Sequence, residues 1–395
     1  MTFPRGFRPP TYPYERLAGA KRLAEGHQGG IVDLSIGTPT DPPPPAAVAA
    51  LSTSGAERGY PASVGSRRYR EAARDWMRRR MGAEVPLEAV AACVGTKELV
   101  ASLPHLLRLR RPDRDTVLYP SLSYPTYEMG AVLAGCRPVP VPLDSAGRLD
   151  LAAVAEADAE RALLLWANSP GNPAGQLEDL GAVAAWGRAR GVPVASDECY
   201  AELTWDGPPR SILEHGLDGV LALHSLSKRS NLAGLRAGFY AGDPDLVTYL
   251  SETRKHAGLM VPGPVQVAAA MALDDDNHAE AQRRRYRERL DRFRAILAGI
   301  GADVAFPKGS LYLWAPVPPT GIPPAAPGSG AVPSRSSGAG SGPAWVFTEW
   351  LAAEGGALVS PGDLYGPAGA SHVRIAMVAP LDRLDLVARR LGTAG

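Results

Sequence analysis

The chain has 395 residues, more than one ordinary hydrophobic core organises, which favours two domains. Lysine and arginine total 42 and aspartate and glutamate 41, so the net charge is close to zero. This charge excludes partners that are attracted by a large net charge, such as nucleic acid or a membrane surface. The longest apolar run, residues 162–167, is far shorter than the ~20 residues that span a bilayer. Three scattered cysteines without metal-ligand spacing, and an N-terminus without an apolar leader, predict a soluble protein of the cytoplasm.

An irregular arm is predicted for the first forty residues, with a short strand at 31–36 before a proline-rich turn. From about residue 46, helices alternate with short apolar runs. The expected helices are 65–80, 97–107, 127–133 and 177–190. The expected strands are 116–119, 162–167, 192–196 and 220–224. Apolar runs of this length between helices indicate a sheet buried on both faces, and therefore an α/β fold with crossover helices.

A different layout begins with a helix at about residues 279–298. After it, the expected strands are 310–314, 358–360 and 372–378, and the expected helices are 345–354 and 381–391. These elements predict a smaller α+β domain, which the N-terminal arm joins. The expected organisation is an arm at 1–45, a large domain at 46–278 and a small domain at 279–395.

Residues 316–343 form an insert rich in proline, glycine, serine and alanine, without the large apolar side chains that would offset ordering. We expect this insert to be a mobile surface loop. The helix at 279–298 carries many arginines, which raises the alternative of a nucleic-acid patch. Its interspersed carboxylates, Glu280, Glu288 and Asp291, favour a solvated face instead.

A reactive lysine is indicated by the segment HSLSKRSNLAGLRAGF, residues 224–239. Ser225, Ser227 and Lys228 directly follow an expected strand, where open α/β sheets bind ligands, and Arg236 comes eight residues after the lysine. Two hydroxyls and a guanidinium suit a phosphate monoester beside the lysine amine. Taken alone, the segment is equally compatible with a surface lysine that follows a strand.

An acid and a phenol follow the expected strand at 192–196, in the segment SDECY at residues 196–200. The Asp197 carboxylate could keep a pyridine nitrogen protonated, which makes such a ring an electron sink. The Tyr200 phenol could donate to an oxygen on the same ring. The alternative is that Asp197 caps the following helix.

Three further segments also lie at strand ends or helix starts. NSPGNPAG at residues 168–175 predicts a rigid turn that presents an asparagine amide, although turn formation alone explains such a segment. VGTKELVASL at 94–103 predicts a helix whose free N–H groups bind an anion, or a simple N-cap by Thr96. In PSLSYPTYE at 120–128, Tyr124 could lie against an aromatic ring or pack in the core.

Together these segments can converge on one edge of one sheet. They supply a lysine, an acid, a phenol, an amide, a stacking aromatic and a phosphate cradle. A phosphorylated pyridine aldehyde needs this set of groups, so the combination predicts binding of such a cofactor.

At these residues the chain resembles the fold-type I, class I/II aminotransferases, from about residue 31 to residue 391 and in the family's motif order. The resemblance implies a mostly parallel central sheet in a large domain, a smaller α+β domain, and pyridoxal 5'-phosphate bound covalently to Lys228. It implies ping-pong transfer of an amino group between an amino acid and a 2-oxo acid. The catalytic residues would be Lys228, which carries the proton, Asp197 and Tyr200.

The resemblance also assigns contacts to cofactor and substrate. The cofactor-binding set is Tyr60, Thr96, Lys97, Tyr124, Asn172, Asp197, Tyr200, Ser225, Lys228 and Arg236. Tyr60, in RGYPASVG, would reach the phosphate of a neighbouring subunit, which implies a homodimer. Arg374 and the backbone of Gly37 would bind the substrate α-carboxylate, and Tyr365 would face the substrate.

A closer resemblance is to actinobacterial succinyldiaminopimelate aminotransferases, carried by VGTKELVASLP, YPTYEMGA, ASDECYAELTWD, HSLSKRSNLAG and SPGDLYGPAGASHVRIA. It implies N-succinyl-LL-2,6-diaminopimelate and 2-oxoglutarate as substrates, in lysine and cell-wall precursor synthesis. Leu235, Gly263 and the long insert depart from that subgroup, so another amino acid in a specialised pathway stays open. Elimination, racemisation or decarboxylation on the same cofactor, and a cofactor-sensing regulator, are further alternatives. The candidate cations for a distal carboxylate are Arg8, Arg22 and Arg229.

Overall fold

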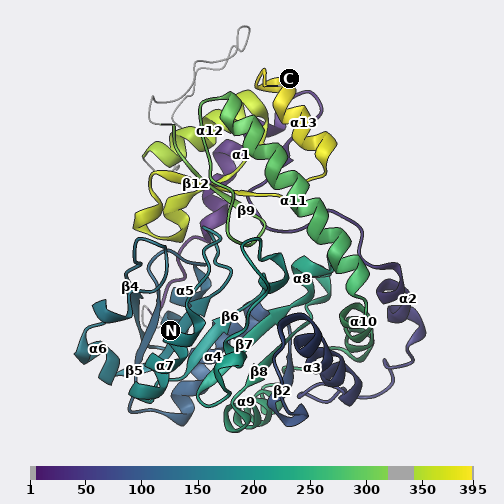
Figure 1. The fold of residues 1–395 in the computed structure, drawn as a ribbon, viewed down its shortest axis with the longest axis vertical. Coiled ribbons are helices and arrows are strands. Elements are labelled where there is room, and N and C mark those ends of the chain that lie inside the picture. The colour runs from purple at the N-terminus through teal and green to yellow at the C-terminus, as the bar shows by residue number, and fades with distance from the viewer. Residues whose placement is uncertain (1–5, 319–341, 394–395) are drawn as a thin grey trace, which may run out of the picture.

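Seven strands form the largest sheet in the computed structural model, which describes residues 6–318 and 342–393 (Figure 1). In spatial order they are β2 (Val90–Cys93), β8 (Gly238–Gly242), β7 (Val220–Ser225), β6 (Val194–Asp197), β5 (Ala162–Asn168), β3 (Thr116–Pro120) and β4 (Arg137–Val141). Strands β4, β3, β5, β6 and β7 are parallel, and β8 runs antiparallel to both its neighbours. The expected α/β fold with a mostly parallel sheet is confirmed.

Helices cover both faces of this sheet, because successive strand residues point to opposite sides. Leu165 and Ala167 of β5 pack with one set of helices, α2 (Pro45–Thr53), α3 (Arg67–Met81), α7 (Leu180–Arg190) and α10 (Gly263–Asp274). Leu164 and Trp166 pack with the other set, α4 (Thr96–Arg110), α5 (Thr126–Leu133) and α9 (Pro244–His256). The short helices α6 (Glu156–Glu160) and α8 (Leu226–Arg229) complete this body.

Polar residues occupy the carboxyl ends of the three central parallel strands. Asn168 ends β5 opposite Asp197, which ends β6, and Ser225 ends β7. Pairing in parallel register brings these three ends to the same edge of the sheet. The sheet therefore places an amide, an acid and a hydroxyl side by side.

A smaller body lies above this sheet in Figure 1 and has its own hydrophobic core. Its antiparallel sheet consists of β11 (Ser360–Pro361), β12 (His372–Ala376) and β9 (Tyr312–Pro316). Its helices are α11 (Asp276–Gly299), α12 (Pro343–Gly355) and α13 (Leu381–Arg390). The N-terminal arm joins it, because β1 (Val32–Asp33) pairs with β10 (Ala357–Leu358) and α1 (Ala18–Glu25) packs against α12.

Several expected elements differ from the structure. The sequence did not indicate β2, β4 or β8: β2 is a short run of small residues, β4 is an edge strand with two prolines, and β8 begins and ends in glycine. The expected strand at 358–360 is wrong, because β10 and β11 belong to different sheets. The expected strand at 31–36 shortens to β1, and the arm contains α1.

Two further expectations concern the insert at 316–343 and the domain boundary at 278 and 279. The central part of the insert at 316–343, residues 319–341, lies outside the described residues. The expected boundary at 278 and 279 falls in the first turn of α11, which runs along both bodies in Figure 1. Within the described ranges, no helix combines the length and apolar character needed to cross a bilayer.

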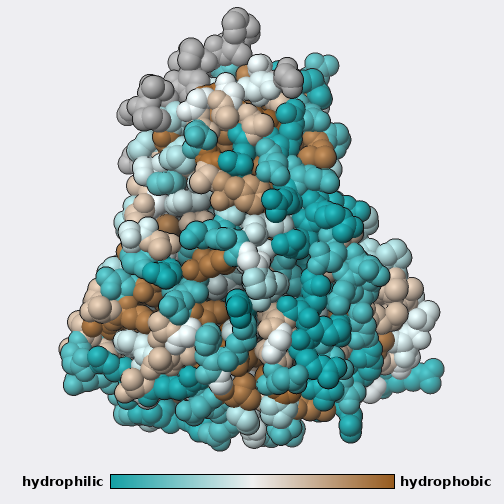
Figure 2. All heavy atoms as spheres, in the orientation of Figure 1, coloured by the Kyte–Doolittle hydropathy of each residue, from teal (hydrophilic) through white to brown (hydrophobic). Residues whose placement is uncertain are grey.

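Two arginines of α11 form ion pairs with other segments of the chain. Arg289 forms a buried ion pair with Asp41 of the arm, and Arg292 pairs with Asp385 of α13. Figure 2 shows hydrophilic side chains along the outer face of this helix. One side of the helix therefore packs against the arm and both bodies, and its other side faces solvent.

Candidate active site

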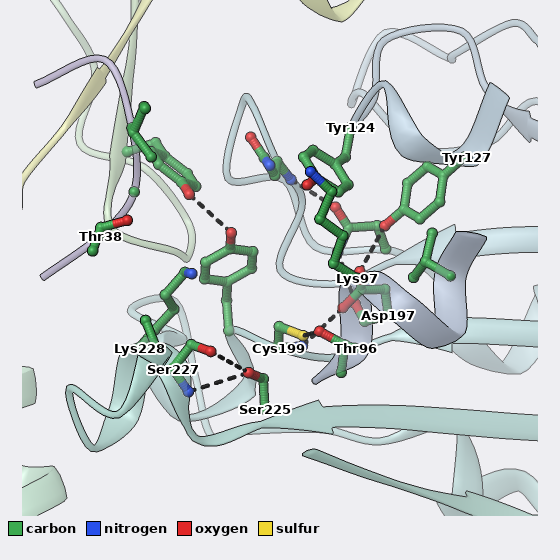
Figure 3. Close-up of a pocket in the computed structure, with 18 of the residues that line it drawn as sticks. Thr38, Thr96, Lys97, Tyr124, Tyr127, Asp197, Cys199, Ser225, Ser227 and Lys228 are labelled. Carbon is green, nitrogen blue, oxygen red and sulfur yellow. Dashed lines mark hydrogen bonds between the residues drawn. The ribbon is translucent and has the colours of Figure 1, made fainter. Parts of the chain in front are cut away.

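A cavity of about 410 Å³ lies at the carboxyl edge of the large sheet, beneath the smaller body (Figure 3). Twelve residues expected from the sequence line it: Gly37, Thr96, Lys97, Tyr124, Asn172, Asp197, Tyr200, Ser225, Ser227, Lys228, Arg236 and Arg374. Tyr365 is buried behind Arg374, with its ring centroid 4.7 Å from the guanidinium carbon. Tyr60 is fully exposed and does not line this cavity.

The turn after β7 directs the Lys228 amine into the cavity (Figure 3). Ser225 caps the short helix α8: its Oγ accepts from the Ser227 N–H at 3.1 Å and donates to the Ser227 hydroxyl at 2.9 Å. The Lys228 carbonyl accepts from the Tyr286 phenol of α11 at 2.9 Å. These bonds fix the backbone on both sides of the lysine.

Burial lowers the pKa of the Lys228 amine. The thiol of Cys199 opposes this effect, whereas the nearby guanidinium groups of Arg236 and Arg374 add to it. The amine therefore loses its proton at a lower pH than an ordinary lysine. An unprotonated amine can act as a nucleophile and as a base.

The Asp197 carboxylate is buried opposite the lysine side of the cavity. Its Oδ2 accepts from the Tyr127 phenol at 3.0 Å and its Oδ1 from the Cys199 N–H at 3.2 Å. Burial nevertheless raises the pKa of this carboxyl group. A buried acid in this position favours a cationic partner, and a protonated pyridine nitrogen would supply one.

The turn after β5 holds Asn172 at the cavity wall. Asn168 anchors the turn: its Oδ1 accepts from the Asn172 N–H at 2.7 Å and its Nδ2 donates to the Asp197 carbonyl at 2.7 Å. The Asn172 Oδ1 accepts from the Arg374 guanidinium at 3.0 Å. The amide therefore lies between the cofactor side of the cavity and the arginine.

An anion cradle forms where α4 begins. Gly95 has φ +72°, and a β-carbon on it would overlap the Arg236 guanidinium. The guanidinium therefore lies against the backbone that opens α4, whose first N–H groups have no partner within the helix. The combination of helix start, arginine and the Ser225 and Ser227 hydroxyls suits a phosphate group.

Arg374 is a buried cation in a cage of aromatic rings. The centroids of Tyr312, Tyr365 and Tyr14 lie 4.2, 4.7 and 5.9 Å from its guanidinium carbon. Its Nη1 donates to Asn172 and its Nη2 to the Ser35 carbonyl, while Nε has no partner among the described residues. A buried cation with a donor to spare suits a carboxylate.

The sequence did not single out four tyrosines of the cavity: Tyr12, Tyr14, Tyr127 and Tyr312. Tyr127 follows Tyr124 at helical spacing, which could have revealed it, but the other three come from the arm and from β9. The suggestion that Arg229 binds a distal carboxylate is wrong, because its guanidinium is buried in an ion pair with Glu202. Arg8 and Arg22 do not line the cavity.

Fold and cavity together define an enzyme with a reactive lysine beside a phosphorylated pyridine cofactor. Residues 30–391 match the aminotransferase class I and II family, and the chain belongs to this family. It is a pyridoxal-phosphate-dependent aminotransferase. The groups present fit this cofactor, because the cradle at Gly95, the buried carboxylate of Asp197 and the amine of Lys228 match its phosphate, ring nitrogen and aldehyde.

The chain is similar to aminotransferases from several bacteria. A probable aminotransferase of Mycobacterium tuberculosis is 44% identical over 97% of this chain and 85% of its own length. The 4-dedimethylamino-4-oxo-anhydrotetracycline transaminase OxyQ of Streptomyces rimosus is 41% identical over 97% of this chain and 99% of its own. The solved structure of a probable N-succinyldiaminopimelate aminotransferase from Thermus thermophilus is 28% identical, with a TM-score of 0.80, over 97% of this chain and all of that one.

Proposed function

We propose that each buried group of the cavity has a distinct role in transamination. Lys228 would hold the cofactor in the resting enzyme, and its amine would then accept the proton from the substrate Cα and deliver it to the cofactor carbon. Pyridoxal phosphate supplies the electron sink that stabilises negative charge at that carbon. Asp197 pairs with the ring nitrogen, Tyr200 and Asn172 contact the 3-oxygen, and Arg374 binds the substrate α-carboxylate.

We also propose that the substrates are N-succinyl-LL-2,6-diaminopimelate and 2-oxoglutarate, in lysine and cell-wall precursor synthesis. Both molecules carry a carboxylate remote from the reacting carbon. The similarity to the Thermus structure supports the first substrate. One structural observation carries the proposal: the side chain of Lys97 brings a further cation into the cavity, in addition to Arg236 and Arg374.

The Lys97 side chain is exposed, and the partners of its ammonium are phenols. It donates to the Tyr12 hydroxyl at 2.8 Å and lies 4.7 Å from the centroid of that ring. Burial lowers the pKa of Lys97, but the Tyr124 and Tyr12 phenols outweigh this effect and the net pKa is above the ordinary value. Among the described residues, no carboxylate neutralises this charge. A distal substrate carboxylate would do so.

Replacing the ammonium by an apolar group of similar length tests this assignment. In Lys97→Met, the KM for 2-oxoglutarate should rise roughly 10-fold or more, because a charge-assisted contact contributes ~1.5–3 kcal/mol. The KM for pyruvate, which has no distal carboxylate, should change little. Steady-state kinetics with both acceptors gives the two values.

A matched control is Lys255→Met, because Lys255 is an exposed lysine of α9 that pairs with Glu252. Its KM values should equal those of the unchanged enzyme. Equal losses for 2-oxoglutarate and pyruvate in Lys97→Met would contradict a role in distal recognition. The donor is tested separately, by comparing glutamate, N-succinyl-diaminopimelate, aspartate, ornithine and methionine.

A second candidate is an aminotransferase of a specialised pathway. The observation that favours it is the 41% identity to OxyQ over nearly the full length of both chains. Such an enzyme would transfer an amino group to a bulky ketone instead of the succinylated substrate. Turnover of a polycyclic ketone with glutamate, without turnover of N-succinyl-diaminopimelate, would establish this candidate over the first.

We further propose that the enzyme is a homodimer in which Tyr60 contacts the phosphate in the neighbouring subunit. The full exposure of this aromatic side chain, away from the cavity of its own chain, supports the proposal. Mixing Tyr60→Phe with the inactive Lys228→Ala should form hybrids with one intact site and restore activity. Absence of restoration in a verified hybrid would contradict sharing of sites between subunits.

We place the enzyme in the cytoplasm. Cys93, Cys136 and Cys199 are free thiols, as a reducing compartment maintains. The activity should follow a cytoplasmic marker on cell fractionation, and activity in the secreted fraction would contradict this location.

A further inference from the structure

The phenol of Tyr312 contacts both the substrate side and the cofactor side of the cavity. Tyr312 begins β9 and is buried. Its ring centroid is 4.2 Å from the guanidinium carbon of Arg374, nearer than that of Tyr365 or Tyr14. Its hydroxyl oxygen is 2.9 Å from that of Tyr200, a bond drawn as a dashed line between two phenols in Figure 3. One side chain therefore touches the groups proposed to hold the substrate and the cofactor.

The backbone fixes this position. On the antiparallel pair β9 and β12, Tyr312 lies opposite Ala376, so Arg374 is its diagonal neighbour on the same face of the sheet. From the other side, the arm closes over the phenol: a β-carbon on Gly37 would overlap the Tyr312 hydroxyl. The ring has no room to turn away from Tyr200.

The charge of Arg374 acts more strongly on the Tyr312 phenol than on the Tyr200 phenol. Burial raises the pKa of both phenols, but the neighbouring guanidinium counteracts the rise more effectively at Tyr312, and the pKa of Tyr200 lies well above its ordinary value. The other titratable groups that face Tyr312 are Tyr14, Cys199 and Tyr286. Either hydroxyl can donate in this bond, and donation from Tyr312, the phenol beside the guanidinium, leaves the Tyr200 proton free to point into the cavity.

We propose that Tyr312 is a positioning residue that donates to Tyr200, directs the Tyr200 hydroxyl at the 3-oxygen of the cofactor, and links this contact to the occupancy of Arg374. The proposal rests on the roles given above to Tyr200 and Arg374. A carboxylate on Arg374 neutralises the cation beside Tyr312 and so weakens donation along the chain of phenols. Substrate binding thereby raises the proton affinity of the lysine nitrogen that holds the cofactor.

The test is a pH titration of the visible absorption of the holoenzyme, with and without succinate, a dicarboxylate that has no amino group. Tyr312→Phe removes one oxygen atom and should raise the titration midpoint by roughly 0.5–1 pH unit, because the Tyr200 contact weakens. Tyr200→Phe should raise it at least as much. The succinate-dependent rise of the unchanged enzyme should shrink in Tyr312→Phe.

A double-mutant cycle separates a relay from two independent effects. The variant lacking both hydroxyls should titrate at the midpoint of Tyr200→Phe alone. Tyr249→Phe is the control, because the Tyr249 phenol of α9 donates to the Leu106 carbonyl at 2.7 Å and does not line the cavity, so its midpoint should not move. Cofactor content and circular dichroism verify that each variant is folded and loaded.

Two results would overturn the proposal while leaving the role of Tyr200 intact: an unchanged midpoint in Tyr312→Phe when Tyr200→Phe shifts, or additive shifts in the double variant. Unchanged midpoints in both single variants would overturn the relay and the proposed role of Tyr200 together.

Discussion

Individual side chains of the cavity depend on partners that lie far away in the sequence. Asp197 accepts from Tyr127, 70 residues earlier, and Arg374 donates to Asn172, 202 residues earlier. Each partner fixes one donor or acceptor and leaves another directed at the cavity. The site is therefore preorganised, and the loss of one charge should affect chemistry more than folding.

Asp197→Asn tests this at the central acid. The amide keeps the shape and can still accept from Tyr127, but it cannot hold a pyridine nitrogen protonated. We expect kcat to fall roughly 10³-fold or more, equivalent to ~4 kcal/mol of barrier. The rate of the glutamate half-reaction measures this, with Asp113→Asn, an exposed acid paired with Arg111, as the unaffected control. A loss below tenfold would argue against the electron-sink role.

At the scale of elements, the ends of β6 and β7 are joined by a buried pair behind the cavity. The Glu198 carboxylate accepts from the Ile212 N–H at 2.8 Å and lies 3.4 Å from His224 Nε2. Burial raises the pKa of Glu198 to about 8 and lowers that of His224 to about 3. Both groups are therefore neutral in the folded protein near pH 7, and this neutrality makes folding depend on pH.

The direction in which pH changes the free energy of unfolding follows from the pKa of Glu198 in the folded and unfolded states. Glu198 ionises with its ordinary pKa of 4.5 when unfolded, so its contribution to stability is complete below that pH and is lost as the pH rises through about 8. Glu198→Gln stays neutral throughout. Between pH 5 and 8.5, the unchanged protein should lose roughly 1–3 kcal/mol more of its free energy of unfolding than the variant. Urea unfolding of the apoprotein measures both curves, and parallel curves would contradict a neutral buried Glu198.

The elements that carry the cavity were predictable where an apolar run ends in a polar residue. Asn168, Asp197 and Ser225 follow such runs, and parallel pairing brings them together. Strands β2, β4 and β8 were not predictable, because small residues, prolines and glycines hide their period. The side-chain contact of Lys97 with Tyr12 was not predictable, because it depends on where the distant arm lies.

At the scale of the molecule, the smaller body and the arm complete a site that the large sheet begins. Arg374 and Tyr312 come from the smaller body, and Gly37 and Tyr14 from the arm. No local pattern places these residues over Lys228, because each of them is 84 or more residues away from it in the chain. Separation of the two bodies would remove the substrate arginine from the lysine, so binding and chemistry depend on the whole fold.

The most direct test of the account is the visible absorption of the purified enzyme loaded with pyridoxal phosphate. We expect the loaded enzyme to show an absorption band that requires Lys228. This band should disappear when glutamate is added and return with 2-oxoglutarate. Lys228→Ala should bind cofactor without this band and without turnover. A band and turnover that persist in Lys228→Ala, or a band that no amino donor changes, would contradict transamination at this site.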